Sequence, residues 1–289
     1  MSTLLNLLVK IWQKLLAKSG MTSGASQNAD EIIGRMIAVF DRQIEIPALE
    51  ALISALKASP DATNLADTAI AIDANAVLRI PQHRKSSDIV DYLSIQHAGP
   101  IILPGQVIQE YWNNQLAAVD TVSKGMQKKF EAFKTEVARY DQTQGEAFEK
   151  ISAGLDAFKN DNSELFHPDT VHKTITFLET LAEKATVPYA PRMAFHQIAE
   201  HRKRVKTPPG FRDVGDGDFY VWVDVLFGLL TMIKAGATPS KLILVTNDGK
   251  IDWCREGEAH PVLCAEAKAL LEVDFEIWTL DKFADSVAN

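Results

Sequence analysis

The chain has 289 residues, of which 46% are hydrophobic and 24% are charged, so it can bury a full core in one large domain with an appendage or in two smaller domains. The formal net charge of −8 argues against a protein that coats itself with nucleic acid by net attraction, although it is compatible with a local basic groove. No apolar run reaches the roughly 20 residues of a membrane-spanning helix, since Lys10 and Lys14 interrupt the most hydrophobic stretch. The two cysteines, Cys254 and Cys264, match no zinc or redox spacing, and we expect a reducing, cytoplasmic location.

The first 67 residues have the pattern of a helical appendage. The opening segment LLNLLVKIWQKLLAK carries leucine, isoleucine and tryptophan at helical spacing. This stripe suits docking on a core or on another chain better than a signal-like segment, because no convincing cleavage site follows it; binding at a membrane surface is the other alternative. After a small, polar linker over residues 20–29, two further helices are expected, around residues 32–40 and after Pro47. We expect these helices to contact the core, a second copy of the chain or a protein partner.

From Thr68 onward, strand-like and helix-like segments alternate. Short apolar runs typical of buried strands are TAIAID, PIILP, KLILVTND and FEIWTL. Segments typical of helices are SSDIVDYLSIQH, GQVIQEYWNNQ and HPVLCAEAKALLEV. The alternation predicts an α/β domain over residues 68–289, with a mostly parallel central sheet flanked by helices. From about residue 116 to residue 205 no convincing strand is visible, and a helical insertion is expected there.

Acidic residues stand where the predicted strands end or the following helices begin. They are Asp73 at the end of AIAID, Asp248 at the end of LILVTND, Glu110 in the helix after PIILPG, and Asp218 at the start of an apolar helix. Ligands of open parallel sheets bind beyond the carboxyl ends of the strands, so these side chains are expected to converge. Converging carboxylates repel one another unless a cation is bound, and oxygen-only ligands favour Mg²⁺ or Mn²⁺ over zinc.

Each acid also has a simpler interpretation. Asp218 is compatible with a helix cap or with a first-turn acid favoured by the helix dipole. Glu110 is compatible with a solvated position on a helix, and Asp248 followed by Gly249 is a turn signal in its own right. Only the order and context of the acids together favour a shared site.

Four blocks of the sequence resemble those of bacterial PIN-like domains, in the branch with a long helical insert between the second and third acids. The blocks are AIDANAVL, LPGQVIQEYWNN, RVKTPPGFRDVGDGDFYVWVDVL and LVTNDGKIDW, and the resemblance covers about residues 69–280. It implies a PIN-like fold and metal-binding, catalytic carboxylates at Asp73, Glu110, Asp218 and Asp248.

The same resemblance implies polar neighbours around these carboxylates. Asn75 and Thr246 match such neighbours, and Asp213 and Asp252 match further acids of this branch. Members often carry two acids before the GK of the last block, and the first of these positions is Asn247 in this chain.

PIN-like domains are similar to flap endonucleases in core and chemistry, so the resemblance implies a metal-dependent endonuclease that acts most often on RNA. A carboxylate-held ion lowers the pKa of a bound water, orients it against a phosphodiester and neutralises charge on the leaving oxygen. This chemistry needs no side-chain nucleophile, and the chain shows no convincing Ser-His-Asp or Cys-His arrangement. Toxin-like, RNA-processing and phage-defence roles all suit such an enzyme.

A basic run before Asp218 offers cations for a nucleic acid backbone. Its members are Arg202, Lys203, Arg204, Lys206 and Arg212. The alternative is a solvated basic face without a function. Single-strand grooves pair such cations with aromatic rings, and the candidates by proximity are Tyr111, Trp112, Phe211 and Trp253, most of which also suit the core.

Two other functions stay open at this point. A phosphatase similar to the haloacid dehalogenases would use Asp73 as its nucleophile, but it needs a second aspartate where this chain has Asn75. A non-catalytic interaction module would use the helical segments and keep the acids without activity.

Overall fold

The computed structural model of the chain describes residues 23–57, 65–113 and 169–288, with short pieces at 128–129, 131–133, 135–136, 149–151 and 153–157. Its centre is a four-stranded sheet in which all neighbouring strands are parallel. Across the sheet the order is β2 (Ile101–Ile102), β1 (Thr68–Ile72), β3 (Lys241–Val245) and β6 (Asp274–Trp278). A small antiparallel ribbon pairs β4 (Cys254–Arg255) with β5 (Glu258–Ala259). The expected α/β class with a parallel sheet is confirmed.

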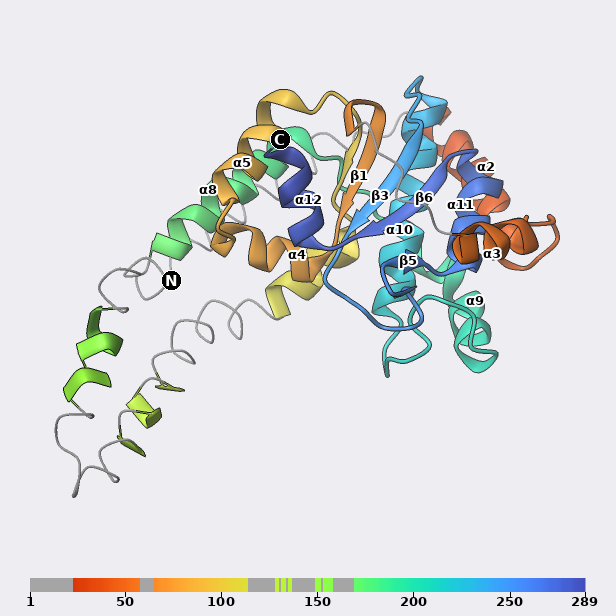
Figure 1. The fold of residues 1–289 in the computed structure, drawn as a ribbon. Coiled ribbons are helices and arrows are strands. Elements are labelled where there is room, and N and C mark those ends of the chain that lie inside the picture. Colours follow the sequence, from red (N-terminus) through yellow and green to blue (C-terminus); the bar gives the residue numbers. More distant parts are fainter. Residues whose placement is uncertain are drawn as a thin grey trace.

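Helices lie on both sides of the sheet (Figure 1). To the left in this view are α4 (Ala74–Arg79), α5 (Ser86–Asp91), α8 (Asp169–Lys184) and α12 (Leu280–Val287). To the right are α2 (Ser23–Phe40), α3 (Ala48–Lys57), α9 (Arg192–Arg204), α10 (Gly217–Lys234) and α11 (Pro261–Leu271). Shorter helical turns are η1 (Leu65–Asp67), η2 (Ile80–Gln82) and the π-helical η3 (Tyr92–Gln96), and a further helix over 105–113 follows β2.

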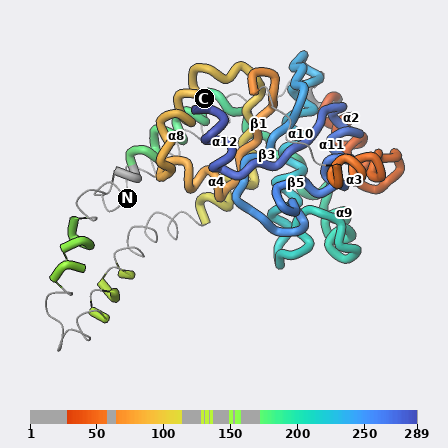
Figure 2. The backbone as a smooth tube through the Cα atoms, in the orientation of Figure 1, coloured from red at the N-terminus to blue at the C-terminus, as the bar shows by residue number. Residues whose placement is uncertain are grey.

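The C-terminal helix α12 packs against the early part of the α/β domain. Figure 2 shows α12, in dark blue, beside the early part of the domain. A hydrogen bond and an ion pair join the two segments, with His83 Nε2 3.0 Å from Asp281 Oδ1 and Lys85 Nζ 2.8 Å from Asp285 Oδ1. Segments from opposite ends of the domain therefore pack against each other.

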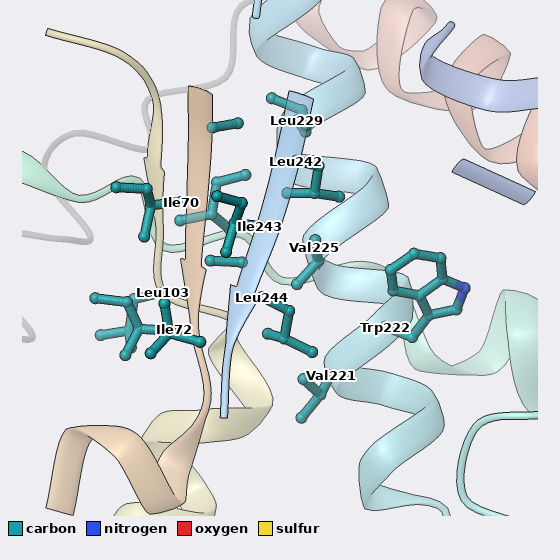
Figure 3. Close-up of a cluster of buried hydrophobic side chains, with 14 of the residues drawn as sticks. Ile70, Ile72, Leu103, Val221, Trp222, Val225, Leu229, Leu242, Ile243 and Leu244 are labelled. Atoms are coloured by element: carbon teal, nitrogen blue, oxygen red, sulfur yellow. The ribbon is translucent and has the colours of Figure 1, made fainter. Parts of the chain in front are cut away.

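The core fixes α10 against the sheet. All five residues of β1 are buried, as is typical of a strand with helices on both faces. Val221, Val225 and Leu229 repeat every four residues along α10 and face Leu242 and Leu244 of β3 (Figure 3). Since α10 begins beside the carboxyl ends of the strands, this packing places its first turn at that edge of the sheet.

The two described N-terminal helices differ in burial. Ile32 and Met36 of α2 are buried in the same hydrophobic core as the sheet. By contrast, α3 has no buried residue and exposes leucine and isoleucine side chains, including Leu52 and Leu56. The boundary at residue 67 and a partner or second copy at these helices stay predictions, and the opening segment lies outside the described residues. No helix in the described ranges is long and apolar enough to cross a bilayer.

The described part of the expected insertion belongs to the core. Phe177 of α8 and Phe195 of α9 are fully buried in it. The described residues between 169 and 205 form no strand, and Thr186 makes an isolated parallel bridge with Ile102 of β2. Its N–H donates to the carbonyl of Ile101 at 2.8 Å. The rest of the insertion lies largely outside the described residues.

A buried ion pair joins α9 to α11. Arg202 donates to both carboxylate oxygens of Glu266, at 2.7 and 3.1 Å, and both side chains are buried. The same carboxylate accepts from Arg42 Nη2 at 2.9 Å and from Trp222 Nε1 at 3.0 Å. The expectation that Arg202 binds nucleic acid is corrected accordingly, since its guanidinium is buried and lies against the rings of Phe40 and Phe219.

Replacing Glu266 with alanine should lower the free energy of unfolding by about 3–5 kcal/mol, because Arg202 would keep a buried charge without its partner. Urea unfolding followed by circular dichroism measures this loss. Arg204→Ala, at an exposed position two residues away, is the control and should change stability by less than about 0.5 kcal/mol. Equal stability of Glu266→Ala and the parent would contradict the assigned role of the pair.

Candidate metal centre

The register of the parallel strands brings their ends to one edge of the sheet. Ile72 is paired with Val245, and Val245 with Trp278, so the residues that follow these strands are neighbours. The N–H of Asp73 donates to the carbonyl of Val245 at 3.1 Å, and the N–H of Thr246 donates to Trp278 at 2.9 Å. Asp73 therefore stands at the edge where open parallel sheets bind ligands.

Polar neighbours fix the Asp73 carboxylate. Its Oδ1 accepts from the N–H of Ala74 at 2.7 Å, and its Oδ2 accepts from Thr246 Oγ1, also at 2.7 Å. The amide of Asn75 donates to the same Oδ2 and, at 3.0 Å, to Thr246 Oγ1. Asn75 in turn accepts from the N–H of Asn247 at 2.8 Å. Asn75 and Thr246 thus lie against the candidate ligand, as the family resemblance implied.

Three carboxylates surround the ammonium group of Lys250. Nζ lies 2.6 Å from Asp213 Oδ2, 2.9 Å from Asp248 Oδ2 and 3.3 Å from Asp218 Oδ2. Burial alone would lower the pKa of Lys250, but its bonds to Asp213 and Asp248 outweigh burial and raise it. The sequence patterns had assigned no role to Lys250, because its partners come from distant segments.

The start of α10 carries Asp218 in its first turn, as expected. The buried ring of Trp253 donates from Nε1 to Asp218 Oδ2 at 3.0 Å. The same oxygen, Oδ2, thus accepts from the indole and lies next to the Lys250 ammonium.

Glu110 reaches the same place from the helix over 105–113. Its Oε1 accepts from Gln106 Nε2 at 3.0 Å, one turn earlier. A Cβ at Gly217 would lie only 2.5 Å from that oxygen, so a side chain there would push the Glu110 carboxylate away from its present position. The carboxylate consequently lies next to the residue that precedes Asp218.

A buried aspartate holds this helix in position. Asp224 of α10 has no exposed surface and accepts from the N–H groups of Gln106 and Ala190, both at 2.9 Å. Arg192 pairs with both of its oxygens, at 2.6 and 2.8 Å. The sequence analysis missed this group, although a single acid inside the apolar run VWVDVL was a usable signal of a buried, paired carboxylate.

Burial and crowding raise the proton affinity of three of the acids. Burial raises the pKa of Asp73, and the charge of Asp248 adds to this effect. Burial also raises the pKa of Glu110, with a contribution from Asp73. The pKa of Asp218 rises to about 7, through burial and its hydrogen bond with Asp213. Burial is the largest cause of each shift, and neighbouring acids add to it.

The other residues that the resemblance places near the site are Asp213, Asp252 and Asn247, and each makes a different contact. Burial tends to raise the pKa of Asp213, but its hydrogen bond with Lys250 outweighs this and lowers it. Asp252 is fully buried and accepts from the N–H of Arg212 at 3.1 Å. Asn247 accepts from the N–H of Leu280 at 3.0 Å and so joins β3 to the start of α12.

The predicted basic and aromatic residues lie in different environments. Lys203 donates to the carbonyls of Val214 and Gly215 and lies 3.2 Å from Asp216 Oδ1, so it fastens the loop before α10. By contrast, three basic side chains are exposed, namely Arg204, Lys206 and Arg212. Of the aromatic candidates, Tyr111 and Trp253 are buried, Phe211 is half-buried and Trp112 is exposed.

The chemistry of the donor set fits a hard divalent ion, because the convergent side chains are carboxylates and three of them already surround a cation. Among the described residues, however, no group of three His, Cys, Asp or Glu side chains is arranged to hold a metal ion as it stands. Binding therefore requires these side chains to draw closer together.

Asp218→Asn should reduce the loss of stability that the metal-free parent shows between about pH 4 and about pH 7. Folded Asp218 keeps its proton up to about pH 7, whereas the unfolded chain releases it near the ordinary pKa of 3.8, so rising pH favours unfolding. Urea unfolding in chelator at several pH values measures the slope. Asp216→Asn, in the same loop, should keep the slope of the parent. Parallel profiles for Asp218→Asn and the parent would contradict the raised pKa.

Comparison with known proteins identifies a family. A family model described as PIN like domain matches residues 69–266, which include Asp73, Glu110, Asp218 and Asp248. No curated protein and no solved structure gives a significant match. The bacterial branch with a long insert stays a prediction. Because the match covers more than half of the chain, the protein belongs to the PIN-like domain family.

Proposed function

We propose that the protein is a metal-dependent endonuclease that hydrolyses phosphodiester bonds in RNA. PIN-like domains are generally nucleases that use divalent metals, so membership of the family suggests a nucleic acid substrate. The observation that carries the proposal is the convergence of acids from separate segments at the carboxyl edge of the sheet, with three of them around one cation. RNA is the proposed substrate because the sequence resembles PIN-like nucleases, most of which act on RNA.

The residues proposed to hold Mg²⁺ or Mn²⁺ are Asp73, Glu110, Asp218 and Asp248. When bound, such an ion activates a water molecule and neutralises charge on the leaving oxygen. The surrounding residues orient these ligands: Asn75 and Thr246 fix Asp73, and Trp253 holds Asp218. Raised pKa values in a group of neighbouring acids are typical of functional sites, which supports the same assignment.

The backbone of the nucleic acid is proposed to contact Arg204, Lys206 and Arg212. All three are exposed and lie in the segment that leads from α9 to Asp218. Lys203 stabilises the loop next to this surface, because its ammonium is bonded to residues 214–216. Arg202 is not included because it is buried.

The alternatives differ in what they predict for Asp73. Membership of the PIN-like family favours a nuclease over a haloacid-dehalogenase-like phosphatase, and Asn75 already serves as a donor to the Asp73 carboxylate. A non-catalytic interaction module would tolerate amides at all the acids. Internal cleavage of an oligonucleotide, compared with hydrolysis of a small phosphate ester, separates these functions.

Amide substitutions at the proposed ligands should abolish most RNA cleavage. Asp73→Asn, Glu110→Gln, Asp218→Asn and Asp248→Asn should each lower the rate on the order of 100-fold or more, because a lost carboxylate weakens the bound ion. Cleavage of labelled single- and double-stranded RNA and DNA with Mg²⁺ or Mn²⁺ measures this. Asp281→Asn, on an exposed carboxylate outside the site, is the matched control. If Glu110→Gln cleaves as fast as the parent, the role of Glu110 is wrong.

Neutralising Arg204, Lys206 and Arg212 together should weaken RNA binding for all sequences and flatten its salt dependence, since fewer counterions are released. Fluorescence anisotropy at several salt concentrations in chelator measures both effects. The control is a triple variant of cations outside this segment, Lys57, Arg84 and Lys268. A salt slope that matches the parent in the first variant would show that these residues form only a solvated face.

A further inference from the structure

Lys250 already places a cation against two of the four proposed metal ligands, Asp218 and Asp248. Its ammonium lies within 3.3 Å of carboxylate oxygens from Asp213, Asp218 and Asp248, which come from the loop before α10, from α10 itself and from the end of β3. The charges of Asp73 and Glu110 also interact with Lys250. One ammonium therefore contacts or influences every acid of the candidate site.

We infer that Lys250 is an internal counter-ion that occupies the cation position of the metal-free site and is displaced when a divalent ion binds. This inference rests on the proposed metal site and concerns its regulation. One ammonium carries a single positive charge, whereas three carboxylates lie within 3.3 Å of it. A divalent ion supplies more charge in the same position and binds carboxylate oxygens at shorter distances.

The local structure allows this exchange without a change of backbone. The N–H of Lys250 donates to Asp248 Oδ1 at 2.9 Å, and its carbonyl accepts from the N–H groups of Trp253 and Cys254, at 2.9 and 3.0 Å. The main chain is thus anchored on both sides, while the side chain is 37% exposed and flexible. Rotation about the side-chain bonds suffices to move the ammonium into solvent.

The displacement model predicts that Lys250 opposes metal binding. If Lys250 helped to hold the ion, its loss would weaken metal binding. If it only fastened the loop, its loss would leave metal binding unchanged. In the metal-free state Lys250 stabilises the fold, because without it the three carboxylates would face one another uncompensated. Loss of Lys250 therefore destabilises the metal-free protein and favours the metal-bound one.

The first test measures Mn²⁺ binding to the full chain by isothermal titration at about pH 7. Lys250→Met, which keeps most of the side-chain length and removes the charge, should bind Mn²⁺ about tenfold more tightly than the parent and melt at a lower temperature in chelator. Lys250→Arg should bind Mn²⁺ like the parent. Equal or weaker binding by Lys250→Met would overturn the inference.

A second test uses the parent protein and does not depend on the folding of a variant. Acetic anhydride reacts with free amines, so Mn²⁺ should raise the acetylation rate of Lys250 about fivefold or more as its ion pairs break. Lys234, which pairs with Glu31 at 2.9 Å, is the internal control and should not change. Mass spectrometry of proteolytic peptides gives both rates.

The outcomes separate the inference from the proposed function. Mn²⁺ binding and RNA cleavage with no change at Lys250 would overturn the inference alone. Release of Lys250 by Mn²⁺ in a protein that cleaves no RNA or DNA would support the inference and overturn the nuclease. A parent protein that binds no Mn²⁺ would overturn both.

Discussion

The repulsion between carboxylates at the carboxyl edge of the sheet is the constraint on which the candidate site depends. Parallel pairing in register places Asp73 beside Thr246, and the packing of α10 on the sheet places Asp218 at the same edge. Folding therefore brings like charges together that would separate in the unfolded chain. Lys250 and the raised pKa values of the acids are two ways in which the metal-free protein accommodates this charge.

Buried ion pairs position the elements that carry these acids. The Asp224 carboxylate ties α10 to the helix over 105–113 through the N–H of Gln106, and to α9 through Arg192, so Glu110 and Asp218 are held on elements that are bonded to each other. Breaking one partner of such a pair costs more than the pair contributes to stability, since a buried charge is left behind. Their contribution is consequently best understood as the positioning of two helices at the edge of the sheet.

Much of the fold could be predicted because its signals are local. Each strand of the sheet is a short apolar run, and the position of Asp73 after TAIAI was visible without any structure. The role of Lys250 could not be predicted, because its three carboxylate partners become neighbours only through the packing of α10 and the loop before it. The amphipathic pattern of α3 correctly indicated a helix, but a pattern does not tell which surface the apolar face contacts.

The basic run HRKR shows where a closer reading of the sequence would have succeeded. Successive residues on a helix point about 100° apart, so consecutive cations cannot all face the same nucleic acid. Arg202 continues the spacing of Phe195 and Ala199, both buried, and this stripe already indicated that its side chain faces the core. A buried guanidinium needs an acid, and Glu266 within the apolar face of the helix after Pro261 was a candidate for that partner. Helical periodicity thus distinguishes the buried Arg202 from the exposed Arg204. Of these two residues, Arg204 is the one that can contact a phosphate.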